Sequence, residues 1–154
     1  MFSKISIPVF ILSVFMFAGC RKANEYPIEP IISFKSLTPD WDPNTGQEHA
    51  TVVISFTDGD GDIGWDESNL QDNFFVECFM KINNVWIDTA SYNGRIKPLI
   101  PEGKNKSIRG DISYFMFSIP YGVNKTIRYE IYMYDRALHR SNTITTSELI
   151  INNP

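Results

Sequence analysis

An acidic, glycine-rich stretch is the part of this chain whose residue types most directly indicate chemistry. Between Asp58 and Asp66, four aspartates and three glycines fall within nine residues. Asp58, Asp60 and Asp62 stand at alternate positions, so a coiled backbone can bring their carboxylates to one point, and the glycines permit the positive φ angles that coiling needs. Without a counter-ion these carboxylates would repel one another. The stretch therefore predicts a loop that holds a cation, with Asp66 as a further candidate ligand.

The pattern matches only the first half of an EF-hand calcium loop. Ile63 stands where that loop needs glycine, and Asn69 stands where its bidentate glutamate belongs. Carboxylate oxygens nevertheless favour Ca²⁺ over zinc or copper, and Glu67 adds another candidate oxygen donor. The residues leave one alternative open, which is an acidic turn without a metal, held by Asp side chains bonded to nearby N–H groups.

The segments around this loop show the period-two alternation of β-strands. Val52, Ile54 and Phe56, for example, share one face of their segment, and polar residues occupy the other. Such one-sided strands favour antiparallel sheets packed face to face. Together with turn signals such as Asn83-Asn84, they predict an all-β fold: an immunoglobulin-like or fibronectin-III-like antiparallel β-sandwich of about seven strands, after a signal peptide. The predicted strands are 31–34, 50–56, 74–82, 85–90, 108–119, 126–134 and 143–151.

The topology of such a sandwich adds a distant residue to the candidate site. In immunoglobulin-like domains the loops after the second and sixth strands lie at the same end, close to where the first strand begins. The sixth predicted strand ends at Tyr134-Asp135. We therefore expect Asp135 to supply a carboxylate to the aspartate loop. Glu29, just before the first strand, is a weaker candidate.

The first residues indicate export. Lys4 is followed by an apolar run, which is the layout of a secretory signal peptide, and the run is shorter than the ~20 residues of a membrane span. Its end, Phe17-Ala18-Gly19-Cys20, resembles the bacterial lipobox, which implies cleavage before Cys20 and lipidation of its sulfur. Several acyl chains would anchor the protein to a membrane. The predicted division is signal peptide 1–19, lipidated cysteine and tether 20–30, and sandwich 31–154.

Two other features carry a wider resemblance. The segment from Tyr129 to Asn142 is similar to the last hairpin of bacterial immunoglobulin-like and fibronectin-III-like domains, with Leu138-His139 in place of Gly-Asn. Together with the lipobox and the Asp-Gly-Asp-Gly-Asp-Ile-Gly run, it resembles small lipoproteins of Bacteroidetes type over most of the mature chain. The resemblance implies a lipid-anchored immunoglobulin-like domain and implies no particular activity.

The residues after Cys20 bear on location. Arg21-Lys22-Ala23-Asn24 has no aspartate directly after the cysteine and no acidic run. By resemblance to other lipoproteins, the first feature weakens the case for inner-membrane retention and the second weakens the case for export to the surface. We therefore expect a cell-envelope protein in the outer membrane that faces the periplasm, with surface exposure left open.

Composition and motifs narrow the classes of function. The net charge of −4 and the lack of a Lys/Arg-rich run exclude a nucleic-acid binder. Once Cys20 carries lipid, Cys78 is the only thiol, so no internal disulfide can form, and its apolar neighbours predict burial. His49, expected in a turn, and His139, expected in a loop, belong to no nucleophile or zinc motif. We therefore expect a protein that is not an enzyme.

These features predict a lipid-anchored, non-enzymatic module of the cell envelope, with Ca²⁺ as a candidate structural ion. The alternative is an accessory lipoprotein that binds a glycan or a protein of an envelope complex. Trp65, beside the aspartates and expected near a loop tip, is the candidate ligand contact, because its ring offers both an apolar face and a polar N–H group.

Overall fold

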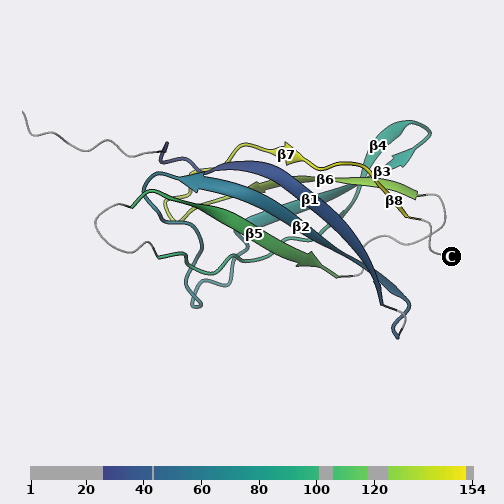
Figure 1. Cartoon of the computed structure of the whole chain (residues 1–154), viewed down its shortest axis with the longest axis horizontal. Coiled ribbons are helices and arrows are strands. Elements are labelled where there is room, and N and C mark those ends of the chain that lie inside the picture. The colour runs from purple at the N-terminus through teal and green to yellow at the C-terminus, as the bar shows by residue number, and fades with distance from the viewer. Residues whose placement is uncertain (1–25, 43, 101–105, 118–124, 152–154) are drawn as a thin grey trace, which may run out of the picture.

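The computed structural model describes residues 26–42, 44–100, 106–117 and 125–151, and this part of the chain is all-β (Figure 1). The predicted signal peptide and the lipidation site, Cys20, lie outside the described residues, as does the start of the tether. Within the described ranges, no helix is long and apolar enough to cross a membrane. The strands are β1 (Ile31–Asp42), β2 (Gln47–Asp58), β3 (Phe74–Ile82), β4 (Val85–Ser91), β5 (Ile108–Met116), β6 (Lys125–Met133), β7 (Ile144–Thr145) and β8 (Leu149–Ile151).

Two antiparallel sheets pack face to face as a sandwich (Figure 1). One sheet has the order β1-β2-β5. The other has the order β4-β3-β6-β7, and β8 also pairs with β6. Strands A, B, E and C′, C, F, G have these neighbours in immunoglobulin-like domains. The predicted sandwich is therefore confirmed, with eight strands in the described residues rather than about seven, and β2 and β6 end at the same end of the molecule.

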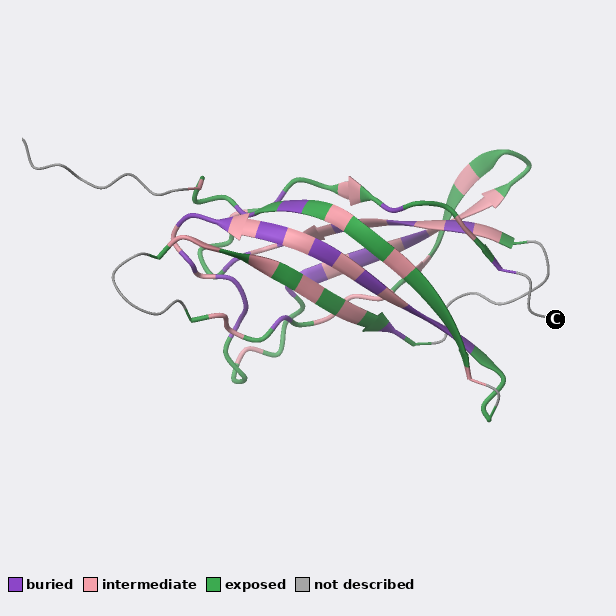
Figure 2. Ribbon diagram, viewed as in Figure 1, coloured by how far each residue is buried: buried purple, intermediate pink, exposed green. Residues whose placement is uncertain are grey.

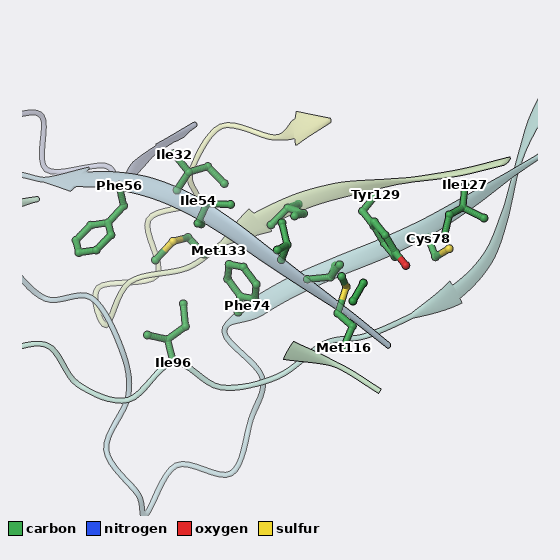
Figure 3. Close-up of a cluster of buried hydrophobic side chains, with 14 of the residues drawn as sticks. Ile32, Ile54, Phe56, Phe74, Cys78, Ile96, Met116, Ile127, Tyr129 and Met133 are labelled. Carbon is green, nitrogen blue, oxygen red and sulfur yellow. The ribbon is translucent and has the colours of Figure 1, made fainter. Parts of the chain in front are cut away.

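The core lies between the sheets, where the strands contribute alternate residues. In β2, Ala50, Val52 and Ile54 are fully buried, and the residues between them are partly exposed (Figure 2). From the opposite sheet, Tyr129 and Met133 of β6 extend into the same core (Figure 3). Burial of each large apolar side chain contributes about 1.5–3 kcal/mol, so this alternation is what holds the two sheets together.

The first hairpin is longer than its pattern predicts. β1 continues to Asp42 instead of ending at Phe34, and β2 begins at Gln47, so His49 lies in a strand and is buried rather than in a turn. A bulge directly after Phe34 shifts the alternation of inward and outward residues, which hides the period-two pattern. β1 is also a largely exposed edge strand, so few of its later residues need to be apolar.

The β3–β4 hairpin confirms the prediction made from Asn83-Asn84. Both residues have positive φ angles, 51° and 62°, as a type I′ turn requires, and Asn tolerates this conformation better than most residues. The hairpin leaves Ile82, Val85 and Ile87 exposed. Its turn lies at the opposite end of the molecule from the end of β2 (Figure 1).

The last predicted strand, 143–151, is two short strands. Between them, Thr146 N–H donates to Tyr129 O at 2.9 Å, and Thr146 Oγ1 accepts from Tyr129 N–H at 3.0 Å. A side-chain hydroxyl thus replaces a backbone carbonyl of the ladder. Regular pairing with β6 therefore stops after Thr145 and resumes at Leu149.

Candidate metal centre

The centre begins at the last residue of β2. Asp58 follows the inward-facing residues Ile54 and Phe56 at the same spacing and is fully buried. Its Oδ2 accepts a hydrogen bond from the N–H of Asp62 at 2.9 Å, so the carboxylate folds the loop back on itself. Gly61 has a φ of 70°, a left-handed conformation that glycine adopts without strain. The loop therefore coils as the alternate aspartates predict.

Four carboxylates converge where this loop meets the loop after β6. One oxygen from each of Asp58, Asp60, Asp62 and Asp135 lies within 4.8 Å of the others. Asp58 and Asp135 are fully buried, whereas Asp60 and Asp62 are half-buried. The two loops meet because β2 and β6 face each other across the sandwich and end at the same side. This group of four carboxylates could hold a metal ion, because carboxylate oxygens are the ligands that hard cations prefer.

Three oxygens of the group have no hydrogen-bond partner among the described residues. They are the buried Oδ1 atoms of Asp58, Asp60 and Asp62. A buried acceptor without a partner costs about 1–3 kcal/mol, and more when it is charged. Native proteins retain such atoms where an ion, a water molecule or a function explains them. Because the three atoms come from the three alternate aspartates, one bound cation would satisfy them together.

Burial and repulsion disfavour the charged state of these carboxylates. Desolvation, with smaller contributions from the charges of Asp60 and Asp62, raises the pKa of Asp58 from 3.8 to about 6. Desolvation also raises the pKa of Asp62, and the charges of Asp135 and Asp60 act in the same direction. A bound cation would offset both causes, because it favours the ionised carboxylate.

Asp135 is held in place by the loop that carries it. Its Oδ1 accepts a hydrogen bond from the N–H of His139 at 2.8 Å, and its Oδ2 lies 2.9 Å from Nδ1 of the His139 ring. The hydrogen bond to Asp135 is the main cause of the raised pKa of His139. Leu138, with a φ of 67°, turns the chain between the two residues. Each oxygen of Asp135 keeps a lone pair for an ion, while His139 fixes the orientation of the carboxylate.

Trp65 lies inside the site and not at an exposed loop tip. The residue is only 8% exposed. Its backbone N–H donates to Ile96 O at 3.0 Å, and its indole Nε1 donates to Asp135 O at 2.9 Å. The structure thus places Trp65 where it joins the aspartate loop to the loop after β6, with only a small part of its side chain exposed.

The other candidate ligands lie outside the group of four. Asp66, Glu67 and Glu29 are all exposed. At Gly64 the loop leaves the group of four and packs against the segment that contains Lys97. Gly64 has a φ of 84°, and an added Cβ would lie 2.0 Å from the carbonyl oxygen of Lys97. Because the chain packs against this second segment before it reaches Asp66, the later acidic residues face solvent.

The start of the domain packs against the same loop. At Gly59 an added Cβ would lie 2.2 Å from Tyr26 O and 2.5 Å from Pro27 O, so only glycine permits this approach. Further along, Asn142 bonds to the backbone of Ile32 through its side chain. Its Oδ1 accepts from the N–H of Ile32 at 2.8 Å, and its Nδ2 donates to the carbonyl oxygen of Ile32 at 2.9 Å. The chain therefore enters the fold in contact with both segments that flank the carboxylates.

Comparison with known proteins adds no family. No family model matches the chain, and no curated protein and no solved structure matches it significantly. The resemblance to lipoproteins of Bacteroidetes type stays a prediction.

Sequence reasoning proposed the four converging carboxylates but missed the residues that hold them. Arg136 donates to carbonyl groups 72 to 75 positions earlier in the chain. His139 was expected only in a loop, and Gly59 was expected only to permit coiling of the backbone. These contacts were missed because they depend on how the two loops meet. The sole signal in the sequence is that Arg136 and His139 are near neighbours of Asp135.

Proposed function

We propose that this protein is a lipid-anchored, non-enzymatic module of the cell envelope whose β-sandwich is stabilised by a calcium ion at the end nearest the membrane. One observation carries the proposal: four carboxylates have oxygens within 4.8 Å of one another, and they include the fully buried Asp58 with its unpaired Oδ1. Lipid attachment at Cys20 and an outer-membrane, periplasm-facing location are supported by the sequence.

The donor set favours calcium among the common ions. All four donors are carboxylate oxygens, which suit Ca²⁺ and Mg²⁺ rather than zinc or copper. His139, the imidazole beside Asp135, bonds to it through Nδ1 and is not among the residues whose ligand atoms converge. Mg²⁺ usually keeps several waters and takes only one or two carboxylates, whereas Ca²⁺ accepts many oxygen ligands in flexible geometry. Four protein carboxylates therefore suit calcium better.

The ion would act on three parts of the chain at once. It would neutralise repulsion at the end of β2, tie the aspartate loop to Asp135, and stiffen the surface against which Tyr26 and Pro27 pack. The contact with Tyr26 and Pro27 is where the chain enters the sandwich from the side of the predicted anchor. Stabilisation of the end nearest the lipid is therefore the role we assign to the cation.

Thermal unfolding in Ca²⁺ and in chelator tests the cation site. A ligand at 100 times its Kd that binds only the folded state adds about 2.7 kcal/mol, which raises the Tm of a domain of this size by roughly 10 °C. Asp58→Asn should abolish the shift, because it removes a buried charged ligand and keeps the size of the side chain. Mg²⁺ at equal concentration should give a smaller shift.

Asp66→Asn is the matched control. Asp66 belongs to the same acidic stretch but is exposed and lies outside the group of four, so this variant should keep the full calcium shift. An equal Tm of the wild-type protein in Ca²⁺ and in chelator would reject the cation site.

Incorporation of a labelled fatty acid tests the anchor. Cys20→Ser should abolish labelling, because it removes the sulfur that carries the lipid. Cys78→Ser is the control, since this buried thiol lies in the core of the sandwich and should leave labelling intact. Label that persists in Cys20→Ser would reject the lipid anchor and leave the cation site standing.

Glycan binding is a second candidate, favoured by an aromatic cluster on the outer face of the five-stranded sheet. Phe75 and Tyr132 stack with ring centroids 4.8 Å apart, Tyr134 meets both rings edge-on, and the Arg140 guanidinium lies 4.0 Å from the Tyr132 centroid. Half-buried aromatic rings beside a cation offer a sugar both an apolar face and polar partners. Glycan-array binding that is lost in Tyr132→Ala and kept in Phe115→Ala, which changes the other sheet, would support it.

A further inference from the structure

One side chain outside the carboxylate group shapes the loop that presents it. Arg136 follows Asp135 directly and donates hydrogen bonds to four consecutive backbone carbonyl groups. Its Nη2 donates to Gly61 O at 3.4 Å, its backbone N–H donates to Asp62 O at 3.1 Å, and its Nη1 donates to Ile63 O at 3.4 Å and to Gly64 O at 3.1 Å. A single residue of the loop after β6 thus fixes the course of the arc that carries Asp62.

These contacts orient Asp62. A carbonyl group that accepts from the guanidinium is directed at Arg136, so the oxygens of this arc turn toward the loop after β6. On the side chain, Asp62 Oδ2 accepts from the N–H of Ala137 at 3.1 Å, and the buried Oδ1 has no hydrogen-bond partner in the part of the chain that the structure describes. Arg136 and its neighbour therefore set both the backbone and the side chain of one candidate ligand.

The charge of Arg136, taken alone, would act against a bound cation. A guanidinium is charged at every physiological pH, and this one is close enough to Asp62 to counter part of the rise in its pKa. The same positive charge repels an approaching Ca²⁺. A role in geometry and a role through charge therefore predict opposite signs for the effect of removing Arg136 on cation affinity.

We propose that Arg136 is a positioning residue of the cation site, an inference that rests on the proposed calcium-binding function. Its planar fork holds residues 61–64 in the curl that brings the carboxylates together, and it does so without touching the ion. Lysine cannot replace it, because an ammonium group is a point charge that lacks the rigid fork of donors. Groups that orient metal ligands in this way typically contribute about 10- to 100-fold in affinity.

Calorimetric titration of the full-length protein with calcium chloride tests this role. We expect Arg136→Gln and Arg136→Lys each to bind Ca²⁺ about 10- to 100-fold more weakly than the wild-type protein. Arg95→Gln is the matched control, because Arg95 also donates to carbonyl groups of this loop, those of Glu67 and Asn69, but beyond the carboxylates. It should keep wild-type affinity. Melting of every variant in chelator shows which ones are folded.

The outcomes separate the two proposals. If the wild-type protein binds and Arg136→Gln binds more tightly, Arg136 acts through its charge; if the variant binds equally well, Arg136 has no net effect on the ion. Either result overturns the positioning role. Wild-type affinity in Arg136→Lys overturns it too, because that variant keeps the charge without the fork. If Arg136→Gln fails to melt cooperatively in chelator, the calcium affinity of Arg136→Lys decides whether Arg136 positions the site. Absence of binding by the wild-type protein instead defeats the proposed function itself.

Discussion

The two ends of the sandwich are built in different ways. At the end where β2 and β6 finish, charged groups are buried and the bonds that hold them join distant parts of the chain, such as Trp65 Nε1 to Asp135 O across 70 positions. At the other end, the β3–β4 hairpin turns through two adjacent asparagines and exposes Val85 to solvent (Figure 1). The first end, called the carboxylate end below, depends on tertiary partners and charge. The second, called the hairpin end, depends on local backbone preference.

This difference has a physical consequence for stability. A buried carboxylate is costly unless a partner or a proton neutralises it, so the carboxylate end should respond to cations and to pH. The turn formed by Asn83 and Asn84 contains no titratable group, so this turn should respond to changes in backbone conformation rather than to cations. Substitutions matched between the two ends test this contrast.

Alanine in place of glycine should separate the ends most strongly. Gly64 and Gly46 both have positive φ angles, 84° and 66°. At Gly64 a Cβ would lie 2.0 Å from Lys97 O, whereas at Gly46, in the β1–β2 turn, the nearest atom is in the Trp41 ring at 4.0 Å. We expect Gly64→Ala to lower the free energy of unfolding by about 3 kcal/mol or more, and Gly46→Ala by about 1 kcal/mol. Urea unfolding measures both, and equal losses would contradict the contrast.

In chelator, the carboxylate end should lose stability as the pH rises. The pKa of Asp58 is about 6 in the folded protein against an ordinary value of 3.8. The contribution of this group to the free energy of unfolding is therefore complete below about pH 3.8 and is lost as the pH rises through about 6. The pKa values of Asp62 and His139 are also raised, and they act in the same direction. We expect Asp58→Asn to flatten the fall of Tm with pH across this window.

Asp111→Asn is the control for this pH dependence. Hydrogen bonds from Lys35 and Ser55 lower the pKa of the exposed Asp111 carboxyl, so its contribution is present above its ordinary pKa and is lost only below that value. The variant should leave the fall of Tm between about pH 4 and 7 unchanged. Curves for Asp58→Asn and the wild-type protein with the same slope would show that burial of Asp58 does not govern this end.

Local signals explain what the sequence predicted correctly about the fold. Strand β2 alternates apolar and polar residues without interruption, and the Asn83-Asn84 turn needs only two residues with positive φ angles. The length of β1 was underestimated because the bulge after Phe34 breaks the alternation. The split of the last strand was missed because Thr146 bonds to β6 through its hydroxyl, which no period-two pattern reveals.

The four carboxylates of the candidate site were predictable from the sequence, but the contacts that hold them were not. The spacing of Asp58, Asp60 and Asp62 indicates a cation loop, and the sandwich topology brings Asp135 near it. The burial of Trp65 and the bonds of Arg136 depend instead on how two loops meet, with partners about seventy positions away along the chain. Because those contacts leave no periodic pattern, sequence reasoning placed Trp65 at the surface and assigned nothing to Arg136.

The smallest effect should come from the hairpin turn. Asn84 has a φ of 62°, so Asn84→Ala should cost about 1 kcal/mol of the free energy of unfolding. Asn84→Gly should be neutral or stabilising by about 0.5 kcal/mol, since Asn-Gly suits a type I′ turn best. Urea unfolding measures these changes, and calorimetric titration of the same variants with Ca²⁺ should give the wild-type affinity. An altered affinity in Asn84→Ala would mean that strain at the turn reaches the carboxylates through β3 and β6, whose pairing runs from the hairpin toward the carboxylate end. The two ends would then be one coupled unit.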